Sequence, residues 1–260
     1  MSPALLAVGA ALLGLLVGSF LNVVARVPAG ESVVRPGSRC PSCGSPVRPR
    51  DNVPVLSWLL LRGGCPDCAA PVAGRYPLVE VLTAAIFAAV ALRFGPGAAL
   101  PAFLYLAAIS VALTFIDLDV HRLPDAIVLP SYVVSGVLLA GPALTGGSWG
   151  AYARGWAAAA ILYAAYFALA VAYPAGMGFG DVKLAGVLGL HLGWLGWGQL
   201  ALGAFLAFFL GGVVGLALIA TGRATRKSAI PFGPFMLVGA LVAVLVGEPI
   251  LALYLGGMSG

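Results

Sequence analysis

The sequence predicts an all-α polytopic membrane protein with about eight transmembrane helices and one small cytoplasmic loop domain. Three observations carry this prediction. Of the 260 residues, 61% are hydrophobic and only 9% are charged, whereas soluble domains carry roughly a quarter of charged residues. The mean hydropathy is +1.04. Apolar runs of about 20 residues, the length that spans a bilayer, recur along the whole chain.

Eight apolar segments match this length. They lie at roughly 4–24, 78–94, 98–117, 126–142, 152–173, 183–197, 199–221 and 232–256. The sixth is short and rich in glycine, so it fits the bilayer thickness least well. The first lacks a basic N-terminal region and runs directly into an arginine-rich loop, so we expect a permanent helix rather than a cleaved signal peptide.

The basic residues predict the orientation, because lysine and arginine are retained on the cytoplasmic side of a membrane. With eight spans, only Arg93 and Arg154 fall on one face. The other face holds Arg26, Arg35, Arg39, Arg48, Arg50, Arg62, Arg75, Arg122, Lys183, Arg223, Arg226 and Lys227. We therefore expect both termini outside and the basic loops in the cytoplasm. The net charge of +5 reflects this topology and a contact with anionic lipid, and it does not indicate nucleic-acid binding.

The only long polar segment, residues 25–77, contains two Cys-x-x-Cys pairs. Cys40 and Cys43 form the first pair, Cys65 and Cys68 the second, and 21 residues separate the pairs. This spacing is typical of a zinc ribbon, in which four thiolates bind one ion. Disulfides are the alternative, but a cytoplasmic loop is kept reduced. Since the protein supplies all four ligands, we expect a structural zinc with no open position for a catalytic water.

Two aspartates indicate a chemical function, because carboxylates at the ends of membrane helices are costly and are functional there by default. Asp117 ends the third segment, and Asp181 precedes the sixth in the motif Gly178-Phe179-Gly180-Asp181. The predicted topology places both at the cytoplasmic boundary. Two close carboxyl groups that share one proton can act as base and acid in peptide hydrolysis. The pair therefore indicates a membrane hydrolase.

The same residues also have structural interpretations. Asp181 could cap the sixth helix, and Asp125 the fourth, because aspartate is common at this position. Gly176, Gly178 and Gly180 leave room for a substrate strand and allow positive φ, or they form a flexible loop.

Other polar residues are less informative. Lys183 could steer the substrate or favour an ionised Asp181, and it could equally extend to the membrane interface. His121 and His191 have no metal-ligand partner at helical spacing, so we interpret both as structural. In the polar loop, residues 56–59 predict an amphipathic stretch at the membrane surface, with Trp58 in the interface.

Taken in order, these motifs resemble those of the type IV prepilin peptidase family. The matching stretches are Gly18–Val24, the two Cys-x-x-Cys pairs, Asp51–Pro54, Ser57-Trp58, Leu61–Gly63, Arg75–Glu80, Ile116–Asp125 and Gly178–Lys183. They cover nearly the whole chain, and the ordered set is more specific than any single motif.

The resemblance implies a GxGD-type aspartic membrane protease in the bacterial inner membrane. Such an enzyme removes the short basic leader of prepilins or pseudopilins after a glycine, on the cytoplasmic side. The family pattern makes Asp117 and Asp181 the catalytic pair, with Gly178, Gly180 and Lys183 as support. The expected organisation is a first transmembrane helix at 1–24, a cytoplasmic metal-binding loop domain with four cysteine ligands at 25–77, and a membrane-embedded peptidase domain of seven helices at 78–260.

The resemblance also implies N-methylation of the new N-terminal residue, with S-adenosylmethionine as methyl donor. That activity is associated with the N-terminal cytoplasmic region, which this chain keeps. Asn22, Arg75 and Glu80 are candidates by position for methyl transfer or substrate binding. A peptidase without methyltransferase activity is the alternative. A polytopic transporter is a more distant one, because the two halves show no repeat symmetry and a carrier has no use for the cysteine loop.

Overall fold

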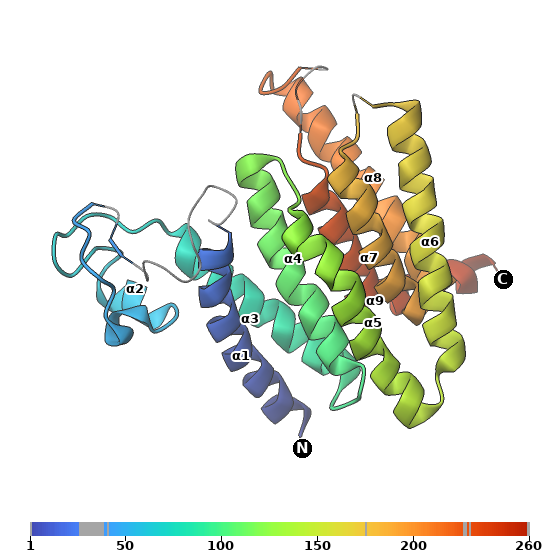
Figure 1. The fold of residues 1–260 in the computed structure, drawn as a ribbon, viewed down its shortest axis with the longest axis horizontal. Helices are drawn as coiled ribbons and strands as arrows, with labels where there is room; N and C mark the ends of the chain where they lie inside the picture. Colours follow the sequence, from blue (N-terminus) through green and yellow to red (C-terminus); the bar gives the residue numbers. More distant parts are fainter. Residues whose placement is uncertain are drawn as a thin grey trace. The chain divides into compact units, whose positions relative to one another are not determined.

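The computed structural model is all-helical, which confirms the predicted fold class. It describes residues 2–25, 39–40, 42–174, 176–225, 228 and 230–258, and within these there are no strands. The elements are α1 (Pro3–Val24), the 3-10 helix η2 (Pro49–Asn52), α2 (Leu56–Leu60), α3 (Arg75–Phe94), α4 (Leu100–Val120), α5 (Asp125–Gly146), α6 (Trp149–Ala172), α7 (Phe179–Leu195), α8 (Trp197–Ala220) and α9 (Gly233–Met258) (Figure 1). Four residues used to predict the orientation, Arg26, Arg35, Arg226 and Lys227, lie outside the described residues.

All eight predicted apolar segments are found as long helices. Seven helices of the described chain are long and apolar enough to cross a membrane, namely α1, α3, α4, α5, α6, α8 and α9. The exception is α7, with 17 residues, or about 26 Å at 1.5 Å per residue. It begins four residues before the predicted start of the sixth segment, so Asp181 lies within its first turn.

The chain divides into two compact units. The first consists of residues 1–96 and 107–112, and the second of residues 97–106 and 113–260. In the first unit, α1 packs along α3 through small residues. A Cβ atom added to Gly14 would lie 2.6 Å from Cα of Ala84, and one added to Gly18 would lie 2.7 Å from Cα of Glu80. These glycines therefore permit a close approach of the two helices. Within a membrane, where the hydrophobic effect does not drive helices together, such van der Waals packing stabilises their association.

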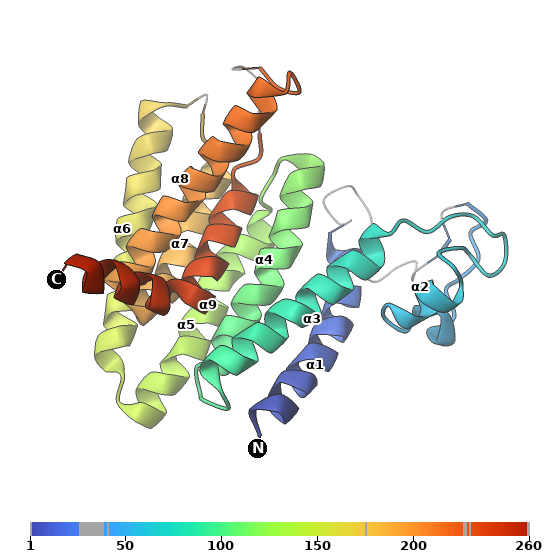
Figure 2. The ribbon, with the colours of Figure 1, turned by 180° about the vertical axis from the view of Figure 1, so that it is seen from behind.

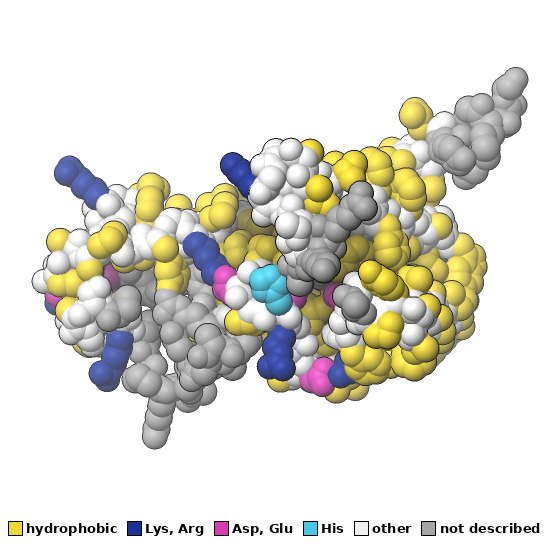
Figure 3. Space-filling view, turned by 90° about the horizontal axis from the view of Figure 1, so that it is seen from above, with side chains coloured by type: hydrophobic (Ala, Val, Ile, Leu, Met, Phe, Trp, Pro, Cys, Tyr) yellow, Lys and Arg dark blue, Asp and Glu magenta, His cyan; other side chains and the backbone are white. Residues whose placement is uncertain are grey.

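In the second unit, α7 is the central helix and packs against α5, α6, α8 and α9 (Figure 2). Its residues from Val182 to Gly193 are largely buried. A Cβ atom on Gly189 would lie 2.7 Å from the carbonyl oxygen of Ala158, so this glycine allows α7 to lie directly against α6. Hydrophobic side chains cover much of the visible surface in Figure 3, as contact with lipid requires.

Candidate functional site

The second unit buries Asp117 in the last turn of α4. The helix ends just beyond it, because His121 adopts a left-handed conformation with φ 51° and donates its backbone N–H to the Asp117 carbonyl at 2.9 Å. The Asp117 side chain is 5% exposed. Its Oδ2 atom is buried and has no hydrogen-bond partner among the described residues. A Cβ atom on Gly233 would lie 2.7 Å from this oxygen, so only glycine at the start of α9 leaves the carboxyl group its space.

The first turn of α7 holds the second aspartate. Asp181 is 8% exposed, and its Oδ2 atom accepts a hydrogen bond from the backbone N–H of Gly178 at 3.2 Å. Gly178 itself is the N-cap residue. The prediction that Asp181 could be the N-cap is therefore wrong in position, although its carboxyl group does satisfy a backbone donor at the helix start.

The structure brings the two aspartates together. Charge on Asp117 acts on Asp181, so their carboxyl groups lie within electrostatic reach of one another. Both groups are buried, and like charges that are close together in a partly dry site cannot both ionise cheaply. Ionising both carboxyl groups at once is therefore costly in this site.

Of the glycines before Asp181, Gly180 serves close packing, and the expectation of positive φ is wrong for Gly178. That residue is extended, with φ −76° and ψ 148°. The glycines of the described chain with φ in the left-handed region are Gly44, Gly63, Gly95, Gly147 and Gly222. A Cβ atom on Gly180 would lie 3.0 Å from Cβ of Leu123, in the connection between α4 and α5. Gly180 therefore lets the start of α7 approach the segment that follows Asp117.

Lys183 links the same two segments through an ion pair. Its Nζ atom lies 2.7 Å and 2.8 Å from the two carboxyl oxygens of Asp125, and 5.0 Å from the ring centre of Phe179. The prediction that Asp125 caps α5 is wrong, because Pro124 is the N-cap residue and Asp125 begins the helix. Tyr132 adds a third link by donating its hydroxyl to the Lys183 carbonyl at 2.7 Å. The start of α7 is thus fixed to the start of α5.

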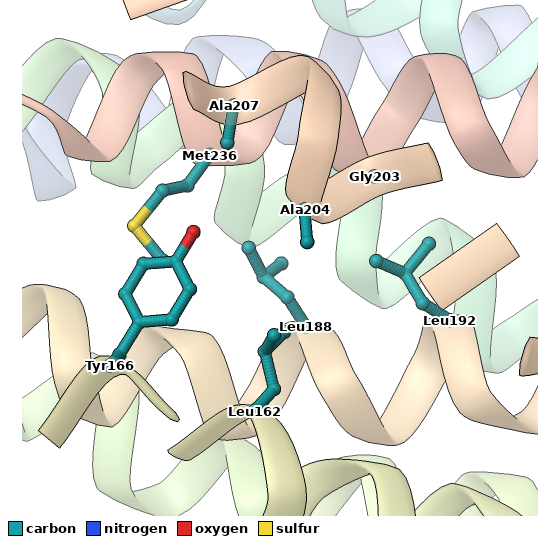
Figure 4. Close-up of a pocket in the computed structure, with 8 residues that line it drawn as sticks. All are labelled: Leu162, Tyr166, Leu188, Leu192, Gly203, Ala204, Ala207 and Met236. Carbon is teal, nitrogen blue, oxygen red and sulfur yellow. The ribbon is translucent and has the colours of Figure 1, made fainter. Parts of the chain in front are cut away.

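A small apolar cavity lies among α6, α7, α8 and α9 (Figure 4). It is lined by Leu162, Tyr166, Leu188, Leu192, Gly203, Ala204, Ala207 and Met236. Its free volume of about 10 Å³ is on the order of one water molecule, so it does not form a substrate site. The Tyr166 hydroxyl, at one end of it, lies within electrostatic reach of Asp181.

The four cysteines of the first unit form one cluster. All four Sγ atoms lie within 4.8 Å of one another, with 3.8 Å between Cys40 and Cys68 and 3.9 Å between Cys43 and Cys65. All four are free thiols, which disfavours the disulfide alternative. Sulfur atoms at the corners of a tetrahedron with Zn–S bonds of about 2.3 Å are about 3.8 Å apart. The cluster therefore has the dimensions of a tetrathiolate metal site.

Two turns of equivalent geometry build this cluster. Cys40 donates its N–H to Ser45 and Cys65 donates to Ala70, each at 2.9 Å. The residue after each second cysteine has positive φ, 73° at Gly44 and 56° at Ala69. Hydrogen bonds from the side chain and backbone of Ser45 lower the pKa of the Cys43 thiol to about 6. The backbone hydrogen bond of Ala70 lowers the pKa of the Cys68 thiol, but the other cysteine side chains and burial outweigh it and raise that pKa to about 12. The thiolate that binds metal is therefore favoured at Cys43 and not at Cys68.

The three residues proposed for methyl transfer lie in the first unit. Asn22 is buried and donates its side-chain amide to the Tyr76 carbonyl at 3.2 Å, which links α1 to α3. Glu80 is buried on α3 and accepts the backbone N–H of Val55 at 2.7 Å. Arg75 begins α3 and is half-buried. Asn22 and Glu80 therefore both have a structural contact, whatever further role they serve.

Sequence reasoning missed several residues that shape the second unit. Tyr166 and Tyr132 are two of eight tyrosines, and no spacing distinguishes them. Arg154 donates to the carbonyls of Gly193 at 2.7 Å and Trp194 at 2.8 Å, and thereby caps the end of α7. A cation suits a helix C-terminus, but Arg154 belongs to α6, so no local signal could have revealed the pairing.

Comparison with known proteins matches the N-terminal third of the chain and most of the remainder to two protein-family models. Residues 12–94 match the Bacterial Peptidase A24 N-terminal domain, and residues 104–216 match the Type IV leader peptidase family. Three similar proteins carry the name Prepilin leader peptidase/N-methyltransferase. The protein of Aeromonas hydrophila is 36% identical, over 94% of this chain and 92% of its own length. That of Burkholderia pseudomallei (strain 1026b) is 36% identical, over 95% and 87%. That of Myxococcus xanthus (strain DK1622) is 42% identical, over 83% and 64%. No solved structure matches the chain.

Proposed function

The chain belongs to the Type IV leader peptidase family, and we propose that it is an aspartic endopeptidase that removes the leader of prepilins or pseudopilins. We also propose that it methylates the new N-terminal residue, as the names of its relatives state for them. It is a multi-pass protein of the inner membrane. The observation that carries the peptidase proposal is the buried pair of Asp117 and Asp181.

The pair supplies what peptide hydrolysis requires. One carboxylate takes a proton from the attacking water, whose oxygen then bonds to the carbonyl carbon of the scissile peptide. The neighbouring carboxylic acid protonates the leaving amine as the C–N bond breaks, so the pair ends with one proton, as it began. The buried Oδ2 atom of Asp117 without a partner among the described residues supports a role in receiving or holding that proton.

The substrate proposal also depends on orientation. Twelve of 14 basic residues fall on the loop side that holds both aspartates in the sequence, which supports an active site that faces the cytoplasm. A prepilin carries a basic leader followed by an apolar helix. With that helix in the bilayer, its cleavage site lies at the membrane surface, where Asp117 and Asp181 end and begin their helices.

We propose that the four cysteines bind a structural zinc ion. The donor set, the sulfur separations and the free thiols fit a tetrahedral site. Cys40 and Cys43 would hold it from the first turn, and Cys65 and Cys68 from the second. The ion would supply folding free energy to a loop with little core of its own. The ion would take no part in peptide hydrolysis, which the two aspartates would catalyse.

For methyl transfer, S-adenosylmethionine supplies the methyl group. The residues that we propose for this site are Asn22, Arg75 and Glu80, of which Asn22 and Glu80 are buried polar groups in a membrane helix pair, where such groups are costly. Their structural contacts use the Asn22 amide nitrogen and one Glu80 oxygen. The Asn22 carbonyl and the second Glu80 oxygen are the atoms with which they would orient substrate or cofactor.

The experiment that tests the peptidase proposal replaces each aspartate separately, as Asp117→Asn and Asp181→Asn. Asparagine keeps the shape but cannot exchange a proton, so each variant should lose cleavage of a prepilin by about a thousandfold or more. The measurement is the mass loss of a prepilin incubated with purified protein in detergent. Asp119→Asn is the matched control, because this exposed aspartate lies two residues from Asp117.

A second assay separates the two activities. Both variants should still methylate a peptide that has already lost its leader, which shows that they are folded. Normal cleavage by either variant would contradict the proposed mechanism, in which both aspartates are required. Absence of methylation in the unmodified protein would instead favour the alternative, a peptidase without methyltransferase activity.

A further inference from the structure

The entry to the short helix α2 has a strained backbone. Val55 adopts φ 61° and ψ −50°, and Leu56 donates its N–H to the Pro54 carbonyl at 2.6 Å across it. This is a γ-turn of the rare, strained form, and positive φ is especially unfavourable for a β-branched residue. Such a conformation persists only where the surrounding structure holds it.

Glu80 links this turn to α3, while hydrogen bonds between Val53 and Ser57 brace it within the loop. Its buried carboxyl group accepts the Val55 N–H at 2.7 Å. Glu80 is the sixth residue of α3, a helix long and apolar enough to span the membrane. At 1.5 Å per residue it lies about 7.5 Å along the helix from its start. The hydrogen bond therefore fixes the beginning of α2 beside the first turns of a membrane helix (Figure 2).

The helix that follows exposes its leucines. Leu56, Leu59 and Leu60 are 53%, 59% and 74% exposed. Trp58 instead faces the cysteine loop and donates its indole N–H to the Val72 carbonyl at 3.0 Å. Trp58 therefore packs on the cysteine loop, and the leucines occupy the outward face of α2.

Basic side chains flank the leucines. Arg50, in η2, precedes them, and Arg62 follows them; both are exposed. Arg50 also forms a long ion pair of 3.9 Å with Asp51, which leaves its side chain largely exposed. The whole loop is also tethered at both ends to membrane helices, by α1 before it and α3 after it. An apolar face with basic neighbours, held at the depth of a membrane surface, matches the chemistry of an anionic lipid interface.

We propose that α2 is an interfacial anchor. Leu56, Leu59 and Leu60 insert into the headgroup region of the adjacent leaflet, Arg50 and Arg62 contact anionic headgroups, and Glu80 sets the depth through the γ-turn at Val55. Because Trp58 joins α2 to the turn of the second cysteine pair, the anchor holds the cysteine loop on the membrane. If the proposed methyl transfer is correct, the loop is thereby held beside the membrane-bound product of cleavage.

The test measures depth directly and needs no enzymatic activity. A fluorescent non-natural amino acid replaces Leu60 in full-length protein in nanodiscs whose lipids carry bromine on their acyl chains. Bromine quenches only nearby fluorophores, so we expect quenching several times stronger at position 60 than at position 47. Val47 is the matched control, because it is an exposed apolar residue of the same loop outside α2.

Two variants and a change of lipid then identify the cause. Quenching at position 60 should fall at least twofold in Leu56→Glu/Leu59→Glu and in Glu80→Ala, which removes the acceptor of the Val55 N–H. It should also weaken when neutral lipid replaces anionic lipid. An unchanged pattern of limited proteolysis shows that the loop of each variant is folded. Equal quenching at positions 60 and 47 would overturn the proposal. So would quenching at position 60 that arises only when a prepilin peptide is added, because α2 would then be a peptide-binding surface.

Discussion

At the residue scale, identical side chains have different roles because of their position at a helix end. Asp117 is buried in the last turn of α4 and Asp181 in the first turn of α7, and each lies within reach of the other's charge. Asp125 begins α5, where it pairs with Lys183 and reaches solvent. Burial and the neighbouring charge, more than the residue type, therefore distinguish a candidate catalytic carboxyl group from a structural one.

A residue-scale prediction concerns Ala69, which has φ 56° where the equivalent turn has Gly44. The left-handed conformation costs an L-residue about 1 kcal/mol or more. Ala69→Gly should therefore stabilise the metal-bound loop and raise its apparent zinc affinity about fivefold. Competition with a chromophoric chelator measures this affinity.

The control for this prediction is Ala70→Gly, at the neighbouring position without positive φ. It should lower the affinity slightly, because glycine adds entropy to the unfolded loop. Equal effects of the two substitutions would show that the left-handed strain at Ala69 does not limit metal binding.

At the element scale, the position of α7 depends on its two ends. Arg154 of α6 binds the carbonyl groups at its C-terminal end, while Asp125 and Tyr132 of α5 bind Lys183 near its N-terminal end. Because Asp181 lies two residues before Lys183, we expect these contacts to influence where its carboxyl group points. The helix itself is short and buried on nearly all sides, so it has little freedom to adjust by tilting in lipid.

The prediction at this scale concerns the ion pair of Lys183 and Asp125. Lys183→Met and Asp125→Asn should each lower kcat for cleavage about tenfold with little change in KM, because small misplacements of a catalytic group are costly. Thermal stability should change little, since an exposed pair contributes about 0.2–1 kcal/mol. Kinetic assays at several prepilin concentrations separate kcat from KM.

Two further variants decide whether position is the cause. The exchange Lys183→Asp/Asp125→Lys should restore part of the lost kcat. Asp67→Asn breaks a comparable ion pair with Arg48, 2.8 Å long, in the cysteine loop, and it should leave cleavage unchanged. Full activity in Lys183→Met would show that the pair does not position Asp181.

At the scale of the whole molecule, the chain separates into two units with different sources of stability. The first relies on the packing of α1 against α3 and on a cysteine cluster. The second relies on helices packed around α7. The two matching family descriptions, at residues 12–94 and 104–216, follow nearly the same division.

The prediction at this scale follows from that separation. Elemental analysis of purified protein should find about one zinc ion per chain. Removal of the metal by a strong chelator should make residues 39–73 sensitive to protease and lower methylation at least tenfold, while cleavage by the aspartates of the second unit persists. Parallel mass-spectrometric assays of cleavage and methylation measure both. Absence of zinc, or equal loss of both activities, would contradict this division of roles.

The sequence by itself determined the membrane class, the eight long helices, the cysteine pairs and the two aspartates, because hydrophobic length and ligand spacing are local properties. It could not reveal that Lys183 pairs with Asp125, that Gly180 packs on Leu123, or that Trp58 faces the cysteine loop. Each of these contacts joins residues from different segments. Only the tertiary structure reveals these contacts, because they depend on which helices pack together. No local sequence pattern specifies that packing.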